Sequence, residues 1–245
     1  MYHTGTSKGT IQFQLWGVPV AIHPMSWIVL AIIGGGFGIS DRDSLVQVLC
    51  FVIAGMVTLL AHEFGHALVG RSLGGGNASI TIAGMGGITR HERTPSSRLN
   101  YFITVLAGPL ASLLLGIVGG AILGLQLGHI GIGIQLSLTL PVNMASPEAV
   151  SLLVNSGISL TLFKLYAALF LICFWWSVFN LLPILPLDGG RLLATLLRND
   201  RLVCIIGLVL CGLLALLSLI SGSWFNFLII GYLGWLNWQF FRARG

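Results

Sequence analysis

Residues 45–70 read LVQVLCFVIAGMVTLLAHEFGHALVG, an apolar run whose one charged residue is Glu63. A helix needs about 20 mostly apolar residues to cross the hydrocarbon layer of a bilayer. This run exceeds that length, so it predicts a membrane-spanning helix. A glutamate flanked by His62 and His66 is costly to bury in such a helix, which indicates that the three polar side chains have a function.

The rest of the chain has the same apolar character. Of its 245 residues 56% are hydrophobic and only 8% are charged, whereas soluble domains carry about a quarter charged residues. This composition excludes an ordinary soluble enzyme and a disordered chain. The formal net charge of +5 does not indicate nucleic-acid binding, because the basic residues lie in short segments between apolar runs. The sequence predicts a polytopic α-helical membrane protein.

Six apolar runs are long enough to cross a bilayer, and six spans place both termini on one side. The predicted spans are about 19–39, 45–70, 100–127, 158–183, 202–220 and 223–241.

The distribution of basic residues indicates on which side of the membrane the termini lie. Arg42 and Lys164 fall on the side opposite the termini. Those on the side of the termini are Lys8, Arg71, Arg90, Arg93, Arg98, Arg191, Arg198, Arg201, Arg242 and Arg244. Because positive residues concentrate in cytoplasmic loops, we expect a multi-pass protein of the cell membrane with both termini in the cytoplasm.

Three connecting segments alternate apolar and polar residues with the period of a strand. Residues 11–15 and the glycine-containing hairpin over 78–90 both fall on the cytoplasmic side, so we expect them to form one small sheet. The third alternation covers 130–140 on the outer side. Helix start and stop signals then predict a short interfacial helix over about 146–157.

The stretch His62-Glu63-Phe64-Gly65-His66 can bind a metal ion. Histidines at i and i+4 lie on one helix face about 5–6 Å apart, close enough to hold one cation. Glu63 can then accept a proton from the attacking water, as in metallopeptidases. The alternative is a hydrogen-bonded packing cluster. His62 lies nine residues before Arg71, about 13 Å along a helix, so the site is expected nearer the cytoplasmic face.

A catalytic metal of this kind needs a third protein ligand. Asp188 follows two prolines at the cytoplasmic end of the fourth span, at the depth of the histidine pair. Its alternative role is that of a helix N-cap for the segment beginning near Gly189. His23 is a rival ligand, although a residue in the wall or gate of the site is the favoured interpretation for it. Two imidazoles and a carboxylate suit zinc, and iron, cobalt or manganese can occupy the same ligands.

The His62–His66 motif together with Asn180-x-x-Pro-x-x-Pro-Leu-Asp188-Gly resembles the site-2 protease family of intramembrane zinc metalloproteases. Weaker similarities extend over residues 17–24 and 107–112. The resemblance implies that His62, His66 and Asp188 bind one zinc ion per chain and that Glu63 is the general base. It implies that Asn180 holds the substrate or stabilises the oxyanion, whereas by itself Asn180 would be a polar residue at a helix break.

The family resemblance also implies partners and an organisation. The expected substrates are transmembrane segments of membrane proteins within the lipid bilayer, and the hairpin over 78–90 is expected to dip into the membrane. We expect residues 1–245 to form a single membrane-embedded domain with no PDZ or CBS module. The oligomeric state is not specified by any of these features.

Two other functions remain open at this point. A CAAX-type membrane protease also uses His-Glu-x-x-His, but its third ligand is expected to be a glutamate on a later helix. No glutamate follows Glu148, which lies on the wrong side of the membrane. A membrane metal-binding or substrate-retaining protein without catalytic activity would need His62, His66 and Asp188 but not Glu63.

Overall fold

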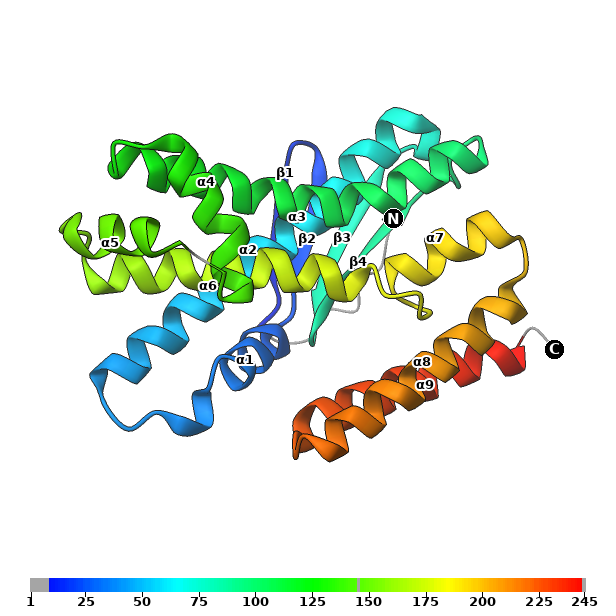
Figure 1. The fold of residues 1–245 in the computed structure, drawn as a ribbon. Helices are drawn as coiled ribbons and strands as arrows, with labels where there is room; N and C mark the ends of the chain where they lie inside the picture. Colours follow the sequence, from blue (N-terminus) through cyan, green and yellow to red (C-terminus); the bar gives the residue numbers. More distant parts are fainter. Residues whose placement is uncertain (1–8, 145, 244–245) are drawn as a thin grey trace.

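A computed structural model describes residues 9–144 and 146–243, which fold into long helices beside one small sheet (Figure 1). The helices are α1 Pro24–Ile33, α2 Arg42–Gly70, α3 Arg98–Gln126, α4 Ile130–Thr139, α5 Pro147–Asn155, α6 Leu160–Asn180, α7 Asp188–Leu197, α8 Asp200–Ile220 and α9 Trp224–Ala243. The strands are β1 Ile11–Leu15, β2 Val18–Ile22, β3 Ala78–Ala83 and β4 Gly86–His91. Lys8 and Arg244, which are predicted to fall on the cytoplasmic side, lie outside the described residues.

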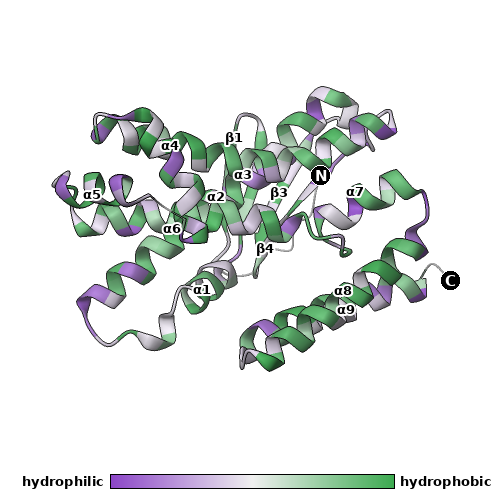
Figure 2. Cartoon of the chain, viewed as in Figure 1, coloured by the Kyte–Doolittle hydropathy of each residue, from purple (hydrophilic) through white to green (hydrophobic). Residues whose placement is uncertain are grey.

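Four helices in this part of the chain, α2, α3, α6 and α8, are long and apolar enough to cross a bilayer. Apolar residues cover most of their length, and polar residues gather at their ends and in the connections (Figure 2). The structure therefore confirms helices at four of the predicted spans, 45–70, 100–127, 158–183 and 202–220.

The first predicted span is not one helix, and that part of the prediction is wrong. Residues 18–22 form strand β2 instead, because their β-branched side chains pair with the neighbouring strands. Helix α1 begins at Pro24 and has ten residues, about 15 Å at 1.5 Å per residue and roughly half of a bilayer core. Gly34 ends it where an added Cβ would lie 2.8 Å from the Phe51 ring of α2.

Helix α9 coincides with the last predicted span, 223–241, but is not among the four apolar helices. It has 20 residues, the length that a span needs. Its apolar run is diluted by Asn226, Asn237, Gln239 and Arg242. By length and composition, the described residues thus contain four of the six expected membrane-spanning helices.

The strand-like alternation over 130–140 was also misleading, because this segment forms helix α4. Its period of two comes from apolar residues that alternate with small or polar ones, and one of these, Gly133, serves a helix contact. An added Cβ on Gly133 would overlap the backbone of Gly120 and Gly124 in α3, so α4 folds back closely against α3. The short helix expected over 146–157 is confirmed as α5, with Ser146 accepting a hydrogen bond from the Ala149 amide.

The expected small sheet is confirmed, with the strand order β1-β2-β3-β4. Strands β2 and β3 run parallel, and the two other pairs are antiparallel. The sheet packs on α2 through a core that includes Val20, Ile80 and Ile82 of the sheet and Leu59 and Ala67 of the helix. This packing holds the second half of α2 against the sheet.

The hairpin of β3 and β4 is closed at its base by Glu92. Its carboxylate accepts hydrogen bonds from the side chain of Asn77 at 2.9 Å and from the Asn77 amide at 3.2 Å. These bonds stabilise the charged form and lower the pKa of Glu92 below its usual value of 4.5. The pair lies at the same end of the fold as Arg93.

Helices α2 and α6 run in the same direction. Asp43 near the start of α2 forms an ion pair with Lys164 near the start of α6. Further along, Thr58 contacts Cys173 at 3.4 Å. Helix α3 runs in the opposite direction and packs against both of them, so α2, α3 and α6 form a central group (Figure 1).

The segment after α6 turns sharply and begins α7 at Asp188. It contains a cis peptide bond before Pro186. Buried Asn237 of α9 holds this segment, because its Oδ1 accepts from the Leu185 amide at 3.2 Å and its Nδ2 donates to the Cys204 carbonyl at 2.6 Å. Helix α7 then connects to the antiparallel pair of α8 and α9 (Figure 1).

Candidate metal centre

Three buried side chains from α2 and α7 converge on one point. His62 Nε2 lies 3.0 Å from Asp188 Oδ2, and His66 Nε2 lies 3.2 Å from the same oxygen. The two Nε2 atoms are 3.2 Å apart. The structure therefore brings together residues that are 126 positions apart in the chain, in an arrangement that could hold a metal ion.

Close packing of α3 on α2 orients this group. An added Cβ on Gly65 would lie 2.4 Å from the Ala107 carbonyl oxygen, and one on Gly108 would overlap the His66 ring. Glycine at both positions lets the two helices approach until His66 Nδ1 lies 2.9 Å from the Thr104 carbonyl oxygen. A carbonyl only accepts, so this contact requires the proton on Nδ1, and Nε2 is the nitrogen that faces Asp188 and can bind a metal ion.

His62 is held in the same manner by a chain of hydroxyl groups. Its Nδ1 lies 3.3 Å from Ser112 Oγ of α3, which lies 3.0 Å from Ser177 Oγ of α6. Ser177 in turn donates to the Cys173 carbonyl at 2.7 Å. Both serines are fully buried. Partners of this kind on the outer nitrogen fix the tautomer of a metal-binding histidine.

The chemistry of these donors fits a zinc ion. Zinc in proteins takes imidazole nitrogen and carboxylate oxygen, and catalytic sites keep three protein ligands and an open position. Two unprotonated Nε2 atoms at 3.2 Å would repel each other unless a cation or a proton lay near both. Together with the carboxylate of Asp188, they make a compact, buried site with the charge and geometry for one divalent cation.

Glu63 points toward the sheet. It is 4% exposed, and Thr89 Oγ1 of β4 lies 2.6 Å from its Oε2. Gly87 of the same strand faces it so closely that an added Cβ would overlap the Glu63 side chain. The carboxylate beside His62 is thus held between α2 and β4.

Asn180 and His23 are placed outside the three-residue group. Asn180 ends α6 and is 9% exposed, with its Nδ2 donating to the Trp176 carbonyl at 2.9 Å. His23 precedes α1, and its amide donates to the Ile82 carbonyl at 2.9 Å. Of the two residues proposed as third ligand, Asp188 is the one that joins the histidines.

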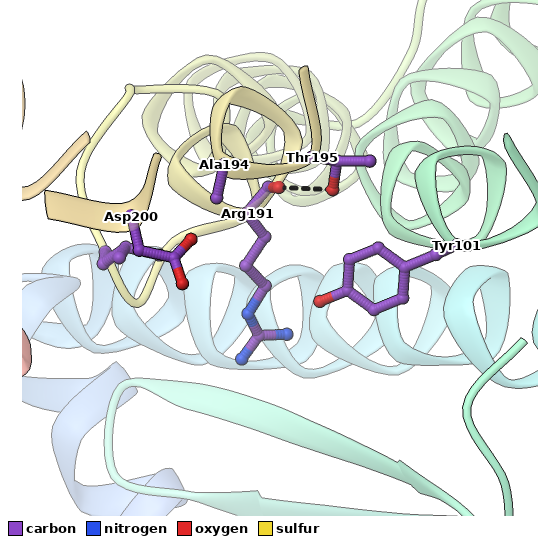
Figure 3. A pocket seen from close by; sticks show the side chains of 6 residues that line it. Tyr101, Arg191, Ala194, Thr195 and Asp200 are labelled. Atoms are coloured by element: carbon purple, nitrogen blue, oxygen red, sulfur yellow. Dashed lines mark hydrogen bonds between the residues drawn. The ribbon is translucent and has the colours of Figure 1, made fainter. Parts of the chain in front are cut away.

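A pocket of about 220 Å³ lies beside α7 (Figure 3). Its lining consists of Tyr101, Leu185, Arg191, Ala194, Thr195 and Asp200. Arg191 connects it to the metal centre, since its Nη1 lies 3.9 Å from Asp188 Oδ1, the oxygen that faces away from the histidines. Thr195 Oγ1 donates to the Arg191 carbonyl at 2.8 Å.

Sequence reasoning did not assign the residues that support this group. Ser112 lies in the stretch 107–112 that resembles the site-2 protease family, and Thr89 lies in the hairpin over 78–90, but neither has a predicted role of its own. Their spacing carries no signal, because each contacts α2 from a different element. Only the packing of α3 and β4 on α2 identifies them.

Comparison with known proteins gives consistent similarities. The model of peptidase family M50 matches residues 50–214. A zinc metalloprotease of Methanocaldococcus jannaschii is 24% identical over 219 residues, which cover 85% of this chain and 53% of that protein. The protein Rip3 of Mycobacterium tuberculosis is 27% identical over 253 residues, covering 98% of this chain and 56% of that protein. This chain spans about half the length of these curated relatives.

A solved structure is similar over nearly the whole fold. The site-2 protease from Methanocaldococcus jannaschii superposes with a TM-score of 0.55 over 95% of each chain, at 22% sequence identity. This similarity establishes that the two chains share a fold.

Proposed function

Since this chain belongs to peptidase family M50, we propose that it is an intramembrane zinc metalloprotease that hydrolyses peptide bonds within or near transmembrane segments of membrane proteins. One observation carries the proposal. His62, His66 and Asp188 converge in a buried group, with Glu63 adjacent to His62 on a helix long and apolar enough to cross a bilayer.

We infer that these three side chains bind one zinc ion per chain. When bound, zinc supplies a Lewis acid that polarises a peptide carbonyl and lowers the pKa of a water molecule. Glu63 accepts the proton of the attacking water and passes it to the leaving nitrogen. Ser112 and Thr104 keep the imidazoles in the tautomer that leaves Nε2 free. The Asn180 side chain, at the end of α6, holds the substrate or stabilises the oxyanion.

The substrate must present an extended stretch at the site, because a peptide bond within a helix is shielded and its carbonyl is already hydrogen-bonded. Strand β4 offers the means. It ends the sheet order and contacts Glu63 directly. An extended peptide can add to such an edge by backbone hydrogen bonds. We propose that the substrate helix unwinds near its cytoplasmic end and pairs there with β4.

We propose a location in the cell membrane with six passes and both termini in the cytoplasm. The first pass consists of β2, α1 and the following loop, and the last is α9. The Asp43–Lys164 pair supports a common outer end for α2 and α6. Arg71, at the other end of α2, then lies on the cytoplasmic side, where positive residues concentrate.

The carboxylate at the centre favours this function over a CAAX-type protease, since it belongs to Asp188 and not to a glutamate. The alternative of a silent metal-binding or substrate-retaining protein makes a different prediction about Glu63. Such a protein would retain its function without that carboxylate.

The experiment compares wild-type protein with Glu63→Gln and with Glu148→Gln, a matched control on α5. The probe, which we call the reporter substrate, is a soluble reporter fused to a Leu- and Ala-rich transmembrane segment with an Asn-Gly pair near its cytoplasmic end. We expect about one zinc per chain in all three proteins. Cleavage should fall by roughly 100- to 10,000-fold in Glu63→Gln alone.

Two results would contradict the proposal. Cleavage by Glu63→Gln at the wild-type rate would remove Glu63 as the base. Wild-type protein that retains the reporter substrate uncut, as Glu63→Gln does, would indicate the silent binding protein instead. A further variant, His66→Ala, should lose zinc as well as cleavage.

A further inference from the structure

One face of strand β4 lies against the part of α2 that carries Glu63, and alternate residues of the strand point toward that helix. In the β3–β4 pairing, Gly87 lies opposite Ile82, Thr89 opposite Ile80, and His91 opposite Ala78. Directly opposed residues of an antiparallel pair point to the same face. These β3 partners are buried against α2, so Gly87, Thr89 and His91 also face that helix.

Each of these three β4 residues has a distinct contact on α2. Gly87 faces the Glu63 side chain, and Thr89 Oγ1 lies 2.6 Å from Glu63 Oε2 and 3.1 Å from the Glu63 carbonyl oxygen. One turn beyond His66, the ring of His91 lies where a Cβ on Gly70 would be. Strand β4 therefore lies alongside the stretch from Glu63 to Gly70, and its two contacts with the Glu63 side chain come from Gly87 and Thr89.

We propose that Thr89 is a positioning residue for the general base, with Gly87 providing the space into which the Glu63 carboxylate fits. The inference rests on the proposed function, because it assumes that Glu63 is the base. A hydroxyl hydrogen donated to Oε2 fixes the rotation of the carboxylate and leaves the lone pairs of Oε1 to accept a proton. Without that donor the carboxylate can rotate away from the attacking water.

The strand that fixes the base is also the edge strand that would receive the substrate. The inner face of β4 contacts Glu63, while its outer backbone edge pairs with no other strand in the part of the chain that the structure describes. Ordering of β4 by a substrate strand would therefore also order the Glu63 carboxylate. The position of Thr89 predicts that its loss lowers the rate of the chemical step and leaves substrate binding intact.

The test measures kcat and KM on the reporter substrate, together with zinc content, for Thr89→Val and Thr89→Ser. Valine keeps the shape of threonine without its hydroxyl, and serine keeps the hydroxyl. Thr81→Val on β3 is the matched control, because Thr81 lies opposite Ile88 and so on the other face of the sheet. Misplacement of a catalytic group by about 1 Å can cost roughly 100-fold.

We expect Thr89→Val to lower kcat by about 10- to 100-fold with KM and zinc content within about twofold of wild type. Thr89→Ser should restore kcat to within about threefold, and Thr81→Val should behave as wild type. A purely structural role would instead lower zinc content or raise KM, and serine would not rescue kcat. Gly87→Ala should lower kcat in the same way if it folds.

Wild-type kcat in Thr89→Val, or a loss of kcat that serine does not rescue, would overturn the inference. If Glu63→Gln is inactive while Thr89→Val is fully active, only the inference fails. If wild-type cleavage does not depend on Glu63, the proposed function fails and the inference with it. The Glu63 and Thr89 variants measured together therefore separate the two claims.

Discussion

Replacing Ser112 by alanine should weaken zinc binding although all three proposed zinc ligands are kept. Ser112 Oγ is the hydrogen-bond partner of His62 Nδ1, at 3.3 Å in a fully buried position. His62 can offer Nε2 to a metal only if Nδ1 carries the proton, and the serine oxygen accepts a hydrogen bond from that N–H group. Ser177 keeps the Cys173 carbonyl as a partner in the variant, so the loss falls on His62.

The magnitude follows from the stranded N–H group. A buried donor left without an acceptor costs about 1–3 kcal/mol. At 1.4 kcal/mol for each factor of ten, this cost corresponds to roughly a 5- to 150-fold loss of affinity. Loss of the outer partner of a metal-binding histidine typically costs about 10- to 100-fold. We therefore expect the Kd for zinc to rise about 10- to 100-fold in Ser112→Ala.

The assay is competition for zinc between detergent-purified protein and a chelating dye. Ser218→Ala is the matched control, because Ser218 is also buried in an apolar helix but donates to the Leu214 carbonyl of its own helix at 2.8 Å. Thermal melting of the zinc-free proteins checks that both variants fold. A Kd for Ser112→Ala equal to that of wild type, or an equal weakening in Ser218→Ala, would refute the reasoning.

Three further variants test the packing that builds the site. Asn237→Leu removes the acceptor of the buried Leu185 amide, so we expect a loss of stability of roughly 1–3 kcal/mol and weaker zinc binding, measured by melting and dye competition, with exposed Asn226→Leu unchanged. Gly65→Ala should separate α2 from α3 and lower the melting temperature, whereas Gly131→Ala, with no atom within 4 Å of the added Cβ, should not. The lowered pKa of Glu92 means that its contribution to stability is present above pH 4.5 and lost as the pH falls through the lowered value. Hydrogen exchange at the hairpin base should therefore accelerate, relative to intrinsic rates, in acid, and Glu92→Ala should abolish this dependence.

Elements defined by one local signal were predicted well. The runs at 45–70, 100–127, 158–183 and 202–220 are helices because continuous apolar residues of that length have no other way to satisfy their backbone in lipid. The segments 11–15 and 78–82 are strands, and their sequence signal is also local. Apolar residues at every second position give each segment one apolar face.

The errors lie where tertiary contacts compete with the local pattern. Residues 18–22 are as apolar as a span, but β1 and β3 on either side turn them into a central strand. Residues 130–139 alternate like a strand, but close contact with the glycines of α3 favours a helix. The segment's own sequence does not reveal these neighbours. A neighbouring element either lies far away in the chain or is joined to the segment by a turn whose geometry the sequence does not predict.

The sequence by itself determined the apolar membrane-type helices and the histidine pair, His62 and His66, because composition and i,i+4 spacing act over short distances along the chain. Tertiary structure alone decided that Asp188, not His23, completes the group, since the turn held by Asn237 brings α7 to α2. It also decided which hydroxyl groups face His62 and Glu63. Those contacts depend on how closely α3 and β4 pack on α2, and that separation is a property of the assembled helices and sheet.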